Sequence, residues 1–227
     1  MNSSDFESQS FARTQEQTFI QRVYQWMAAG LAVTGLVAYG VSTNPGLMKA
    51  LAGGAFLVVA LIELGIVFWL SASINKISAQ AAMIGFLAYS ALNGLTLSFI
   101  FLAYTGISIA TTFFITAGSF AAVSLFGWMT KTDLTSLGGY LFMALIGVLI
   151  GSFVNIFFHS PAFYWLLTYA SLAVFIGLTA YDTQRLKDIY RAGASTEQSA
   201  IMGALRLYLD FINMFLLLLR LFGRRRD

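Results

Sequence analysis

Long apolar stretches follow one another along this chain of 227 residues, and short polar or glycine-containing segments separate them. From residue 20 onward, seven stretches can be delimited, at residues 20–42, 50–72, 79–103, 107–129, 136–158, 162–184 and 199–222. An α-helix needs about 20 apolar residues to span a bilayer, and several such runs in series form a bundle. The runs are continuous and do not alternate in segments of about ten residues, which argues against a membrane barrel. The pattern therefore predicts an all-α, polytopic membrane helix bundle with about seven spanning helices.

Turn signals separate the predicted spans. The Asn-Pro-Gly sequence at residues 44–46 predicts a turn after the first span, and Pro161 breaks the chain between the fifth and the sixth. The third and fourth spans meet at residues 104–106, which leaves room only for a tight hairpin. The longest inner connection, residues 185–198, holds three basic and two acidic residues and is expected to be a solvated turn.

Small residues recur at a spacing of four inside the spans, as in Gly118 to Ala122 and Gly147 to Gly151. Such spacing lets helices approach closely where lipid provides no hydrophobic drive. We therefore expect these positions to lie at helix–helix contacts within one bundle.

The composition agrees with a chain that has almost no water-soluble body. Hydrophobic residues make up 58% of the chain and charged residues only 10%, whereas a soluble domain carries about 25% charged residues. We expect a polar cytoplasmic N-terminal segment at residues 1–18, a transmembrane bundle at 19–222 in contact with the lipid bilayer, and a basic tail at 223–227. The net charge of +3 comes from loop and tail arginines, so no nucleic-acid partner is expected. The absence of cysteine excludes disulfides and thiol chemistry.

Basic residues near the span ends predict the orientation, because cytoplasmic loops carry an excess of them. With the N-terminus in the cytoplasm, Lys76, Lys131 and Arg191 fall on the inner side. The outer loops then hold only Lys49 and His159. A full seventh span would place the basic tail outside, against this bias. The alternative is a re-entrant last segment that returns the tail to the cytoplasm; we favour seven spans.

Three carboxylates lie inside apolar sequence, Glu63 in the second span, Asp182 late in the sixth and Asp210 in the seventh. An ionised group at mid-membrane costs at least about 2.5–3.5 kcal/mol, so it usually faces a partner or water. Asp182 and Asp210 each lie 14 residues from Thr196 in the connecting turn. On adjacent antiparallel helices they would therefore sit at nearly equal depth, about 20 Å of helix from the turn.

The two aspartates form a candidate pair. Two carboxylates held close together in a low dielectric cannot easily both ionise, so one of them would hold a proton near neutral pH. Such a pair is a candidate proton sensor or cation ligand, since Ca²⁺ prefers oxygen ligands. The alternative is that each is satisfied separately, Asp210 for example by Arg206 one helical turn earlier.

Other polar residues inside the spans leave alternatives open. Glu63 could line a pathway, or it could remain protonated and hydrogen-bonded between helices. Asn93, Asn155 and Asn213 are amides that we expect to form interhelical hydrogen bonds. Asn213 lies one turn from Asp210, so it is also a candidate pathway or ligand residue at the same site.

No enzymatic site is predicted. The chain contains no HExxH or GxSxG motif and no phosphate-binding loop. It also lacks a His and Cys cluster with metal-ligand spacing, and the single His159 is expected at the membrane interface. We expect no catalytic residue and no cofactor, with Ca²⁺ only as a candidate permeant ion.

Several segments resemble the Bax inhibitor-1 family, the transmembrane Bax-inhibitor-motif proteins, and are most similar to its bacterial inner-membrane branch. They are ALNGLTLSFIF (91–101), TAGSFAAVSLFGWMTKTDL (116–134), ALIGVLIGSFVNIFF (144–158), TAYDTQRLK (179–187) and LYLDFINMF (207–215). The resemblance implies seven helices, of which six surround the last. It also implies a pH-sensitive calcium leak controlled by an aspartate pair, which corresponds to Asp182 and Asp210 here. Glu63 matches an acidic position in the second helix of some members.

One departure from the family pattern concerns the latch of the gate. Family members can carry an arginine at the inner end of the second helix that contacts the sixth-helix aspartate. Here Ile74 stands at about that place, and Lys76 is the nearest basic residue. A latch between Lys76 and Asp182 would be weaker, because lysine lacks the bidentate fork of arginine.

Three functions follow from these observations. The first is a passive, pH-gated cation leak, with Ca²⁺ and protons as its partners. The second is an H⁺/cation exchanger that uses the same carboxylates; the inverted repeat with broken helices that is typical of exchangers is not evident in the sequence. The third is a regulatory protein that acts through membrane-protein partners.

Overall fold

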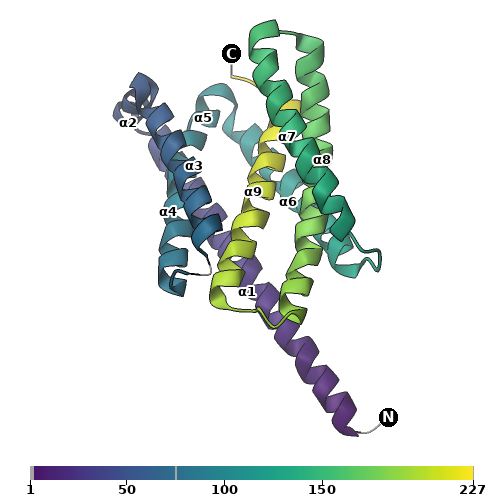
Figure 1. The fold of residues 1–227 in the computed structure, drawn as a ribbon. Helices are drawn as coiled ribbons and strands as arrows, with labels where there is room; N and C mark the ends of the chain where they lie inside the picture. The colour runs from purple at the N-terminus through teal and green to yellow at the C-terminus, as the bar shows by residue number, and fades with distance from the viewer. Residues whose placement is uncertain (1–2, 75, 227) are drawn as a thin grey trace. The chain divides into compact units, whose positions relative to one another are not determined.

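The structure is a computed structural model that describes residues 3–74 and 76–226, with side chains from residue 14 onward. Within these residues the chain is helical, and its only β-type pairing is an isolated bridge between Tyr104 and Arg225. The helices are α1 (Ser3–Ser42), α2 (Pro45–Ala50), the π-helix η1 (Leu51–Ala55), α3 (Phe56–Ser73), α4 (Ala79–Leu97), α5 (Ile100–Ala103), α6 (Gly106–Met129), α7 (Thr135–Phe158), α8 (Pro161–Arg191) and α9 (Glu197–Phe222) (Figure 1). The predicted all-α class is confirmed.

Six helical segments of the described chain are long and apolar enough to cross a membrane. They are Pro45–Ser73, Ala79–Ala103, Gly106–Met129, Thr135–Phe158, Pro161–Arg191 and Glu197–Phe222. In α9, 72% of the residues in the most apolar 18-residue stretch are buried, against 28% or less in the other five. The last helix is therefore the most buried of the six, as predicted.

The first predicted span, residues 20–42, forms the second half of α1, and α1 is not among these six segments. Its contacts nevertheless place it beside α9. Trp26 hydrogen-bonds to Glu197, and Thr34 hydrogen-bonds to Tyr208 eleven residues further along α9. The two helices therefore run in the same direction. Since α9 is a membrane span, this part of α1 crosses the same layer, which supports seven spans.

The predicted turns are found, and one helix is longer than expected. Asn44 caps α2, with its side-chain oxygen accepting hydrogen bonds from the next two backbone N–H groups, and α8 begins at Pro161. The sixth span was predicted to end at residue 184, but α8 continues to Arg191. No helix-breaking residue occurs before Gly193, which adopts a left-handed φ of 70° and ends the helix.

The second span is not the regular helix that the sequence predicted for residues 50–72. It contains a break at η1, where Gly53 and Gly54 leave the helical conformation. Gly54 has a φ of 113°, a value that side-chain-bearing residues rarely adopt. Apolar periodicity cannot reveal such a break, because glycine is tolerated inside membrane helices.

The chain divides into two compact units. The first comprises the chain up to Ala103 together with Leu186–Tyr208, and the second comprises Tyr104–Arg185 and the chain from Leu209 onward. Both α8 and α9 thus contribute residues to each unit.

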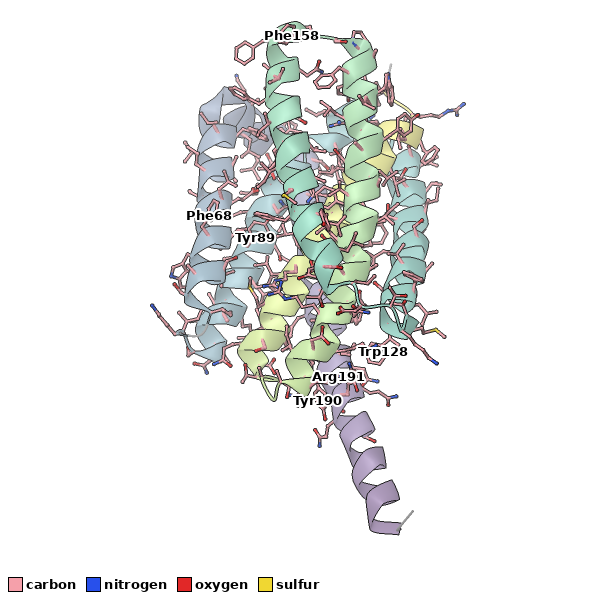
Figure 2. The ribbon with its side chains drawn as sticks, turned by 45° about the vertical axis from the view of Figure 1, so that its right-hand side comes forward. Phe68, Tyr89, Trp128, Phe158, Tyr190 and Arg191 are labelled. Carbon is pink, nitrogen blue, oxygen red and sulfur yellow. The ribbon has the colours of Figure 1, made fainter. Side chains whose placement is uncertain are left out.

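In the first unit, α4 packs against α1 and α3 through glycines. A Cβ atom on Gly94 would lie 2.8 Å from the carbonyl oxygen of Thr34, and one on Gly85 would lie 2.9 Å from the Trp69 ring. Figure 2 shows Phe68 on the outer side of α3, where 71% of it is exposed, whereas Tyr89 on α4 is buried. The outer face of α3 is thus the apolar surface expected for a lipid-facing helix.

In the second unit, α7 and α8 form a hairpin whose two helices lie side by side (Figure 1). Glycines again set the approach, since Cβ atoms at Gly138 and Gly177 would collide with Tyr181 and Leu141. The close contact predicted for the pair Gly147 and Gly151 is confirmed at Gly151, where a Cβ atom would lie 2.8 Å from Leu167 of α8. At Gly118 and Gly147 the prediction is wrong, because a Cβ atom there would meet no atom of another described segment within 4 Å. Spacing alone does not tell which small residues face a helix and which face lipid.

The C-terminal tail returns to the turn that precedes α6. The Arg224 backbone N–H donates to the Ser108 hydroxyl at 2.8 Å, and the Thr105 N–H donates to the Arg224 carbonyl at 3.1 Å. Because α9 is continuous over 26 residues, it is about 39 Å long and spans the membrane completely. The re-entrant alternative for the last segment is therefore wrong, and the tail lies on the side of the 104–106 turn.

Candidate functional site

The segment Thr179–Gln184, which contains Asp182, packs α8 against its neighbours in the second unit. Thr179 is fully buried and its hydroxyl lies 3.5 Å from the Met214 sulfur on α9. The Ala180 carbonyl meets α6 at Gly127, where no side chain separates the two backbones. The neighbour of Asp182 on its N-terminal side, Tyr181, covers Gly138 of α7.

The residues after Asp182 continue this anchoring. The Thr183 hydroxyl is 3.4 Å from the Ser124 hydroxyl on α6. Gln184 fixes the loop between α6 and α7, because its side chain accepts from the Leu134 N–H at 2.7 Å and donates to the Thr132 carbonyl at 2.8 Å. The backbone that carries Asp182 is thus held by three helices and a loop.

The Thr179–Met214 contact defines how α8 and α9 align around the two aspartates. Asp182 lies three residues after Thr179, and Asp210 lies four residues before Met214. Each aspartate is therefore one helical turn from the contact, on the same face of its helix and in the direction of the connecting turn. This alignment supports the prediction that the two aspartates lie at nearly equal depth.

The two carboxyl groups differ in exposure. Asp210 is buried, with 4% of its surface exposed, whereas Asp182 is half-buried. Phe211, which follows Asp210, packs edge-on against Phe113 and Phe120 of α6. The Asp210 side chain therefore starts from a tightly packed, aromatic part of α9.

The amide donor of Asn213 bonds within its own helix. Its side-chain amide donates to the Leu209 carbonyl of α9 at 2.8 Å, so the expected interhelical hydrogen bond is not formed by this donor. Asn155 likewise acts locally and accepts from the Ser160 N–H at 3.1 Å. Within the described residues, no group of three or more His, Cys, Asp or Glu side chains could hold a metal ion. A cation at the aspartates would need backbone, amide or water oxygens as further ligands.

Glu63 lies in the first unit and belongs to a separate polar cluster. The Asn93 side chain on α4 donates to Glu63 Oε2 on α3 at 3.3 Å. Asn93 also accepts from the Tyr208 hydroxyl of α9 at 3.2 Å, and that hydroxyl lies 2.6 Å from the Thr34 hydroxyl of α1. Asn93 thus forms the expected interhelical bonds, and Glu63 is hydrogen-bonded between helices. Thr34 and Tyr208 could not be predicted from the sequence, because single uncharged polar residues in apolar spans usually carry no functional signal.

The candidate latch residue Lys76 lies in the short connection between α3 and α4, and its side chain is exposed. Ile74 is the C-cap of α3. The latch between Lys76 and Asp182 stays a prediction.

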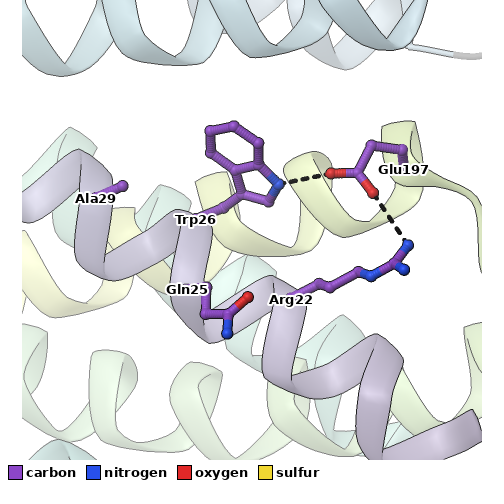
Figure 3. A pocket seen from close by; sticks show the side chains of 5 residues that line it. All are labelled: Arg22, Gln25, Trp26, Ala29 and Glu197. Carbon is purple, nitrogen blue, oxygen red and sulfur yellow. Dashed lines mark hydrogen bonds and ion pairs between the residues drawn. The ribbon is translucent and has the colours of Figure 1, made fainter.

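A pocket of about 580 Å³ opens beside the first turn of α9 in the first unit (Figure 3). Glu197 lies between two side chains of α1, accepting from Trp26 Nε1 at 2.7 Å and pairing with Arg22 at 3.4 Å. Gln25 and Ala29 complete the lining. Glu197 also suits the positive end of the α9 dipole. This cluster fixes the start of α9 to α1.

These features define an integral membrane protein of helical bundle type that carries carboxylates inside three of its spans. Comparison with known proteins then assigns the family. A family model described as "Inhibitor of apoptosis-promoting Bax1" matches residues 16–227. The chain therefore belongs to the Bax inhibitor-1 family.

Bacterial relatives match over nearly the whole chain. The chain is 48% identical over 217 residues to "Inner membrane protein YbhL" of Escherichia coli, covering 92% of this chain and 93% of the relative. It is 42% identical over 215 residues to an uncharacterized protein of Borreliella burgdorferi, with the same coverage of each. An uncharacterized protein of Deinococcus radiodurans is 42% identical over 216 residues, covering 94% of this chain and 93% of the relative. The family and the names of these relatives point to a membrane protein that is not an enzyme.

Proposed function

We propose that this protein is a passive, pH-sensitive leak for Ca²⁺ in a bacterial inner membrane, with its N-terminus in the cytoplasm. The gate is the pair Asp182 and Asp210. The observation that carries the proposal is the alignment of α8 and α9 around Thr179 and Met214, because it favours equal depth for the two carboxyl groups. The burial of Asp210 adds support, since a buried carboxyl in a membrane span rarely serves packing alone.

The mechanism follows from the electrostatics of two carboxyl groups in a low dielectric. When the pair holds a proton, one carboxyl donates to the other and the two helices stay together. When the proton is lost, two negative charges repel each other and α8 separates from α9. The charged oxygens then face the opening and attract Ca²⁺, which prefers oxygen ligands. The leak therefore increases as the pH rises through the titration of the pair.

The segment Thr179–Gln184 holds α8 in place, so that α9 is the helix that moves. Its contacts with Gly127, Ser124 and the loop at residues 132–134 hold α8 in the second unit. By contrast, the Thr179–Met214 contact is a weak hydroxyl–sulfur interaction. Repulsion between the aspartates would therefore be relieved by a local separation of α9 from α8 at this level, because Arg220 of α9 also joins the two helices further along, through a hydrogen bond to Thr168 at 3.3 Å.

A second candidate, an H⁺/cation exchanger, is favoured by one observation. The break at Gly53 and Gly54 makes the second span discontinuous, and broken membrane helices are typical of secondary transporters. Such a protein would bind protons and cations alternately at the same carboxylates.

The experiment that decides between them measures Ca²⁺ and protons together in liposomes that contain the purified protein. An indicator of Ca²⁺ and an indicator of pH report the lumen, with the membrane potential clamped. A leak predicts Ca²⁺ entry down its gradient without stoichiometric proton exit, faster at pH 8 than at pH 6. Proton exit in fixed proportion to Ca²⁺ entry would instead establish the exchanger. Liposomes no more permeable than protein-free ones would refute both.

A further inference from the structure

A buried polar cluster joins helices of the first unit, whereas both aspartates of the candidate pair belong to the second unit. We call it the Tyr208 cluster; its members are Thr34 of α1, Glu63 of α3, Asn93 of α4 and Tyr208 of α9. Tyr208 is its centre, because its hydroxyl contacts both the Thr34 hydroxyl at 2.6 Å and Asn93 Oδ1 at 3.2 Å. Asn93 extends the cluster to Glu63 Oε2 at 3.3 Å. The Tyr208 hydroxyl thus joins α1, α4 and α9 directly, and Asn93 adds α3.

Because this cluster is buried, its hydrogen bonds favour one arrangement of the helices that carry it. Tyr208 and Ser90 are fully buried and Thr34 is 3% exposed. The Thr34 hydroxyl also lies 2.8 Å from the Ser90 carbonyl, which ties α1 to α4 at the same level. A buried hydroxyl that loses its partners cannot recover them from water. Any rotation of α9 that moves Tyr208 away is therefore opposed.

The ring of Tyr208 is separately held by aromatic contacts. Its centroid lies 5.7 Å from that of Phe86 and 5.8 Å from that of Tyr89, both nearly perpendicular to it. These contacts are apolar and would survive the removal of the hydroxyl alone. Tyr89 is also buried, but no hydrogen bond of its hydroxyl is found in the described part of the chain. The neighbouring tyrosine is thus a natural control.

The hydrogen bonds of Tyr208 fix α9 at a second level along the helix, beyond the contacts of Glu197. Glu197, held by Trp26 and Arg22 as Figure 3 shows, fixes only the beginning of the helix. Tyr208 lies eleven residues, or about three turns, further on. Two anchors at different levels fix both the tilt of a helix and its rotation. Asp210 follows two residues later in the same continuous helix.

We infer that the Tyr208 hydroxyl is a positioning group that holds α9 in the closed arrangement through Thr34 and Asn93. This inference rests on the proposed function for its effect on the leak. The hydrogen bonds of the Tyr208 hydroxyl with Thr34 and Asn93, which we call the clamp, lie within the first unit. Breaking the clamp lets α9 rotate or shift, and the closed state of the gate loses part of its preference. Removing the hydroxyl should therefore raise the leak at every pH, including the pH at which the wild type is closed.

The experiment uses Tyr208→Phe and Thr34→Val, with Tyr89→Phe as the matched control and Thr34→Ser as the variant that keeps a hydroxyl. The first readout is Ca²⁺ entry into liposomes at pH 6. Tyr208→Phe and Thr34→Val should each raise it about five- to tenfold, the factor that one buried hydrogen bond carries. The double variant should add little, because the two residues form one interaction. Tyr89→Phe and Thr34→Ser should stay near wild type.

The second readout does not depend on ion flux. The chain has no cysteine, so Ala204→Cys introduces a single thiol one turn before Tyr208, at a position that is fully buried. Its labelling by N-ethylmaleimide reports how often α9 opens. Labelling should be about fivefold faster with Tyr208→Phe and unchanged with Tyr89→Phe.

The two readouts separate the possible failures. Faster labelling with Tyr208→Phe in a protein that shows no Ca²⁺ flux would keep the clamp and refute the proposed function. Equal labelling and equal flux in Tyr208→Phe and wild type would overturn the clamp, whatever the aspartates do. Equal increases in Tyr208→Phe and Tyr89→Phe would also overturn it, because they would report general loosening of the core.

Discussion

At the scale of single residues, the candidate gate consists of two carboxylate side chains embedded among ordinary packing residues. The sequence reveals Asp182 and Asp210 because a charge inside an apolar span is costly and therefore rare. It does not reveal Gln184, which bonds to the loop at residues 132–134, or Thr183, which contacts Ser124 of α6. Hydroxyl residues in spans often bond only to their own helix, as Thr116 does to the Thr112 carbonyl. Residue type alone cannot tell a polar side chain that contacts another segment from one that bonds only to its own helix.

Asp133, in the loop that Gln184 holds, offers a test of which carboxylate senses protons. Hydrogen bonds from the Thr135 hydroxyl and backbone N–H lower the pKa of the exposed Asp133 carboxyl below its ordinary value. A group with a lowered pKa is already charged above that ordinary value, so it does not titrate between about pH 6 and pH 8. Asp133→Asn should therefore leave the pH dependence of Ca²⁺ flux unchanged. A flattened profile in this variant would move the sensor from the membrane to the loop.

At the scale of helices, the number of spans and most of their ends followed from apolar runs and turn residues. What did not follow is how the helices touch. Gly127 meets α8 directly, whereas Gly118 of the same helix has no close neighbour in the described chain. Both are glycines within one apolar stretch, and only the direction of each around α6 tells them apart. The break at Gly54 was also hidden, because it depends on backbone dihedral angles and not on side-chain character.

The α6–α8 contact predicts unequal effects of two identical substitutions. Gly127→Ala places a methyl group against the Ala180 carbonyl, and overpacking of this kind costs about 1–3 kcal/mol. Gly118→Ala meets no atom within 4 Å and should be neutral or slightly stabilising, since alanine favours helix. Unfolding of the purified variants in detergent mixtures measures the difference. Equal stability of the two variants would show that α6 does not pack against α8 through Gly127.

At the scale of the whole molecule, the path of the chain decides the topology. The sequence left the last segment open between a full span and a re-entrant loop. The continuous α9 and the bonds from Arg224 to Thr105 and Ser108 resolve it in favour of a full span. The basic tail thus lies with the turn at residues 104–106, which the predicted orientation places outside, against the bias of the other loops. Long-range backbone pairing of this kind cannot be derived from hydropathy.

Cysteine labelling tests this topology in a chain that has no cysteine of its own. Single cysteines at Asn44 and Arg226 should react with an impermeant reagent added to the outer side of intact cells. A cysteine at Lys131 should react only after the membrane is opened. Labelling of the Arg226 position only from inside would contradict the seventh span, whereas outside labelling at Lys131 would invert the orientation.

The central claim is that Asp182 and Asp210 act as one proton-sensitive unit. The most direct measurement is Ca²⁺ flux in liposomes from about pH 6 to pH 8 for Asp182→Asn, Asp210→Asn and the double variant, with Asp133→Asn as control. Asparagine keeps the shape and the hydrogen-bonding capacity but cannot titrate. Each single variant should flatten the pH profile, and the double variant should add little, because a shared proton is lost with either partner. Wild-type pH profiles in both single variants would contradict the claim.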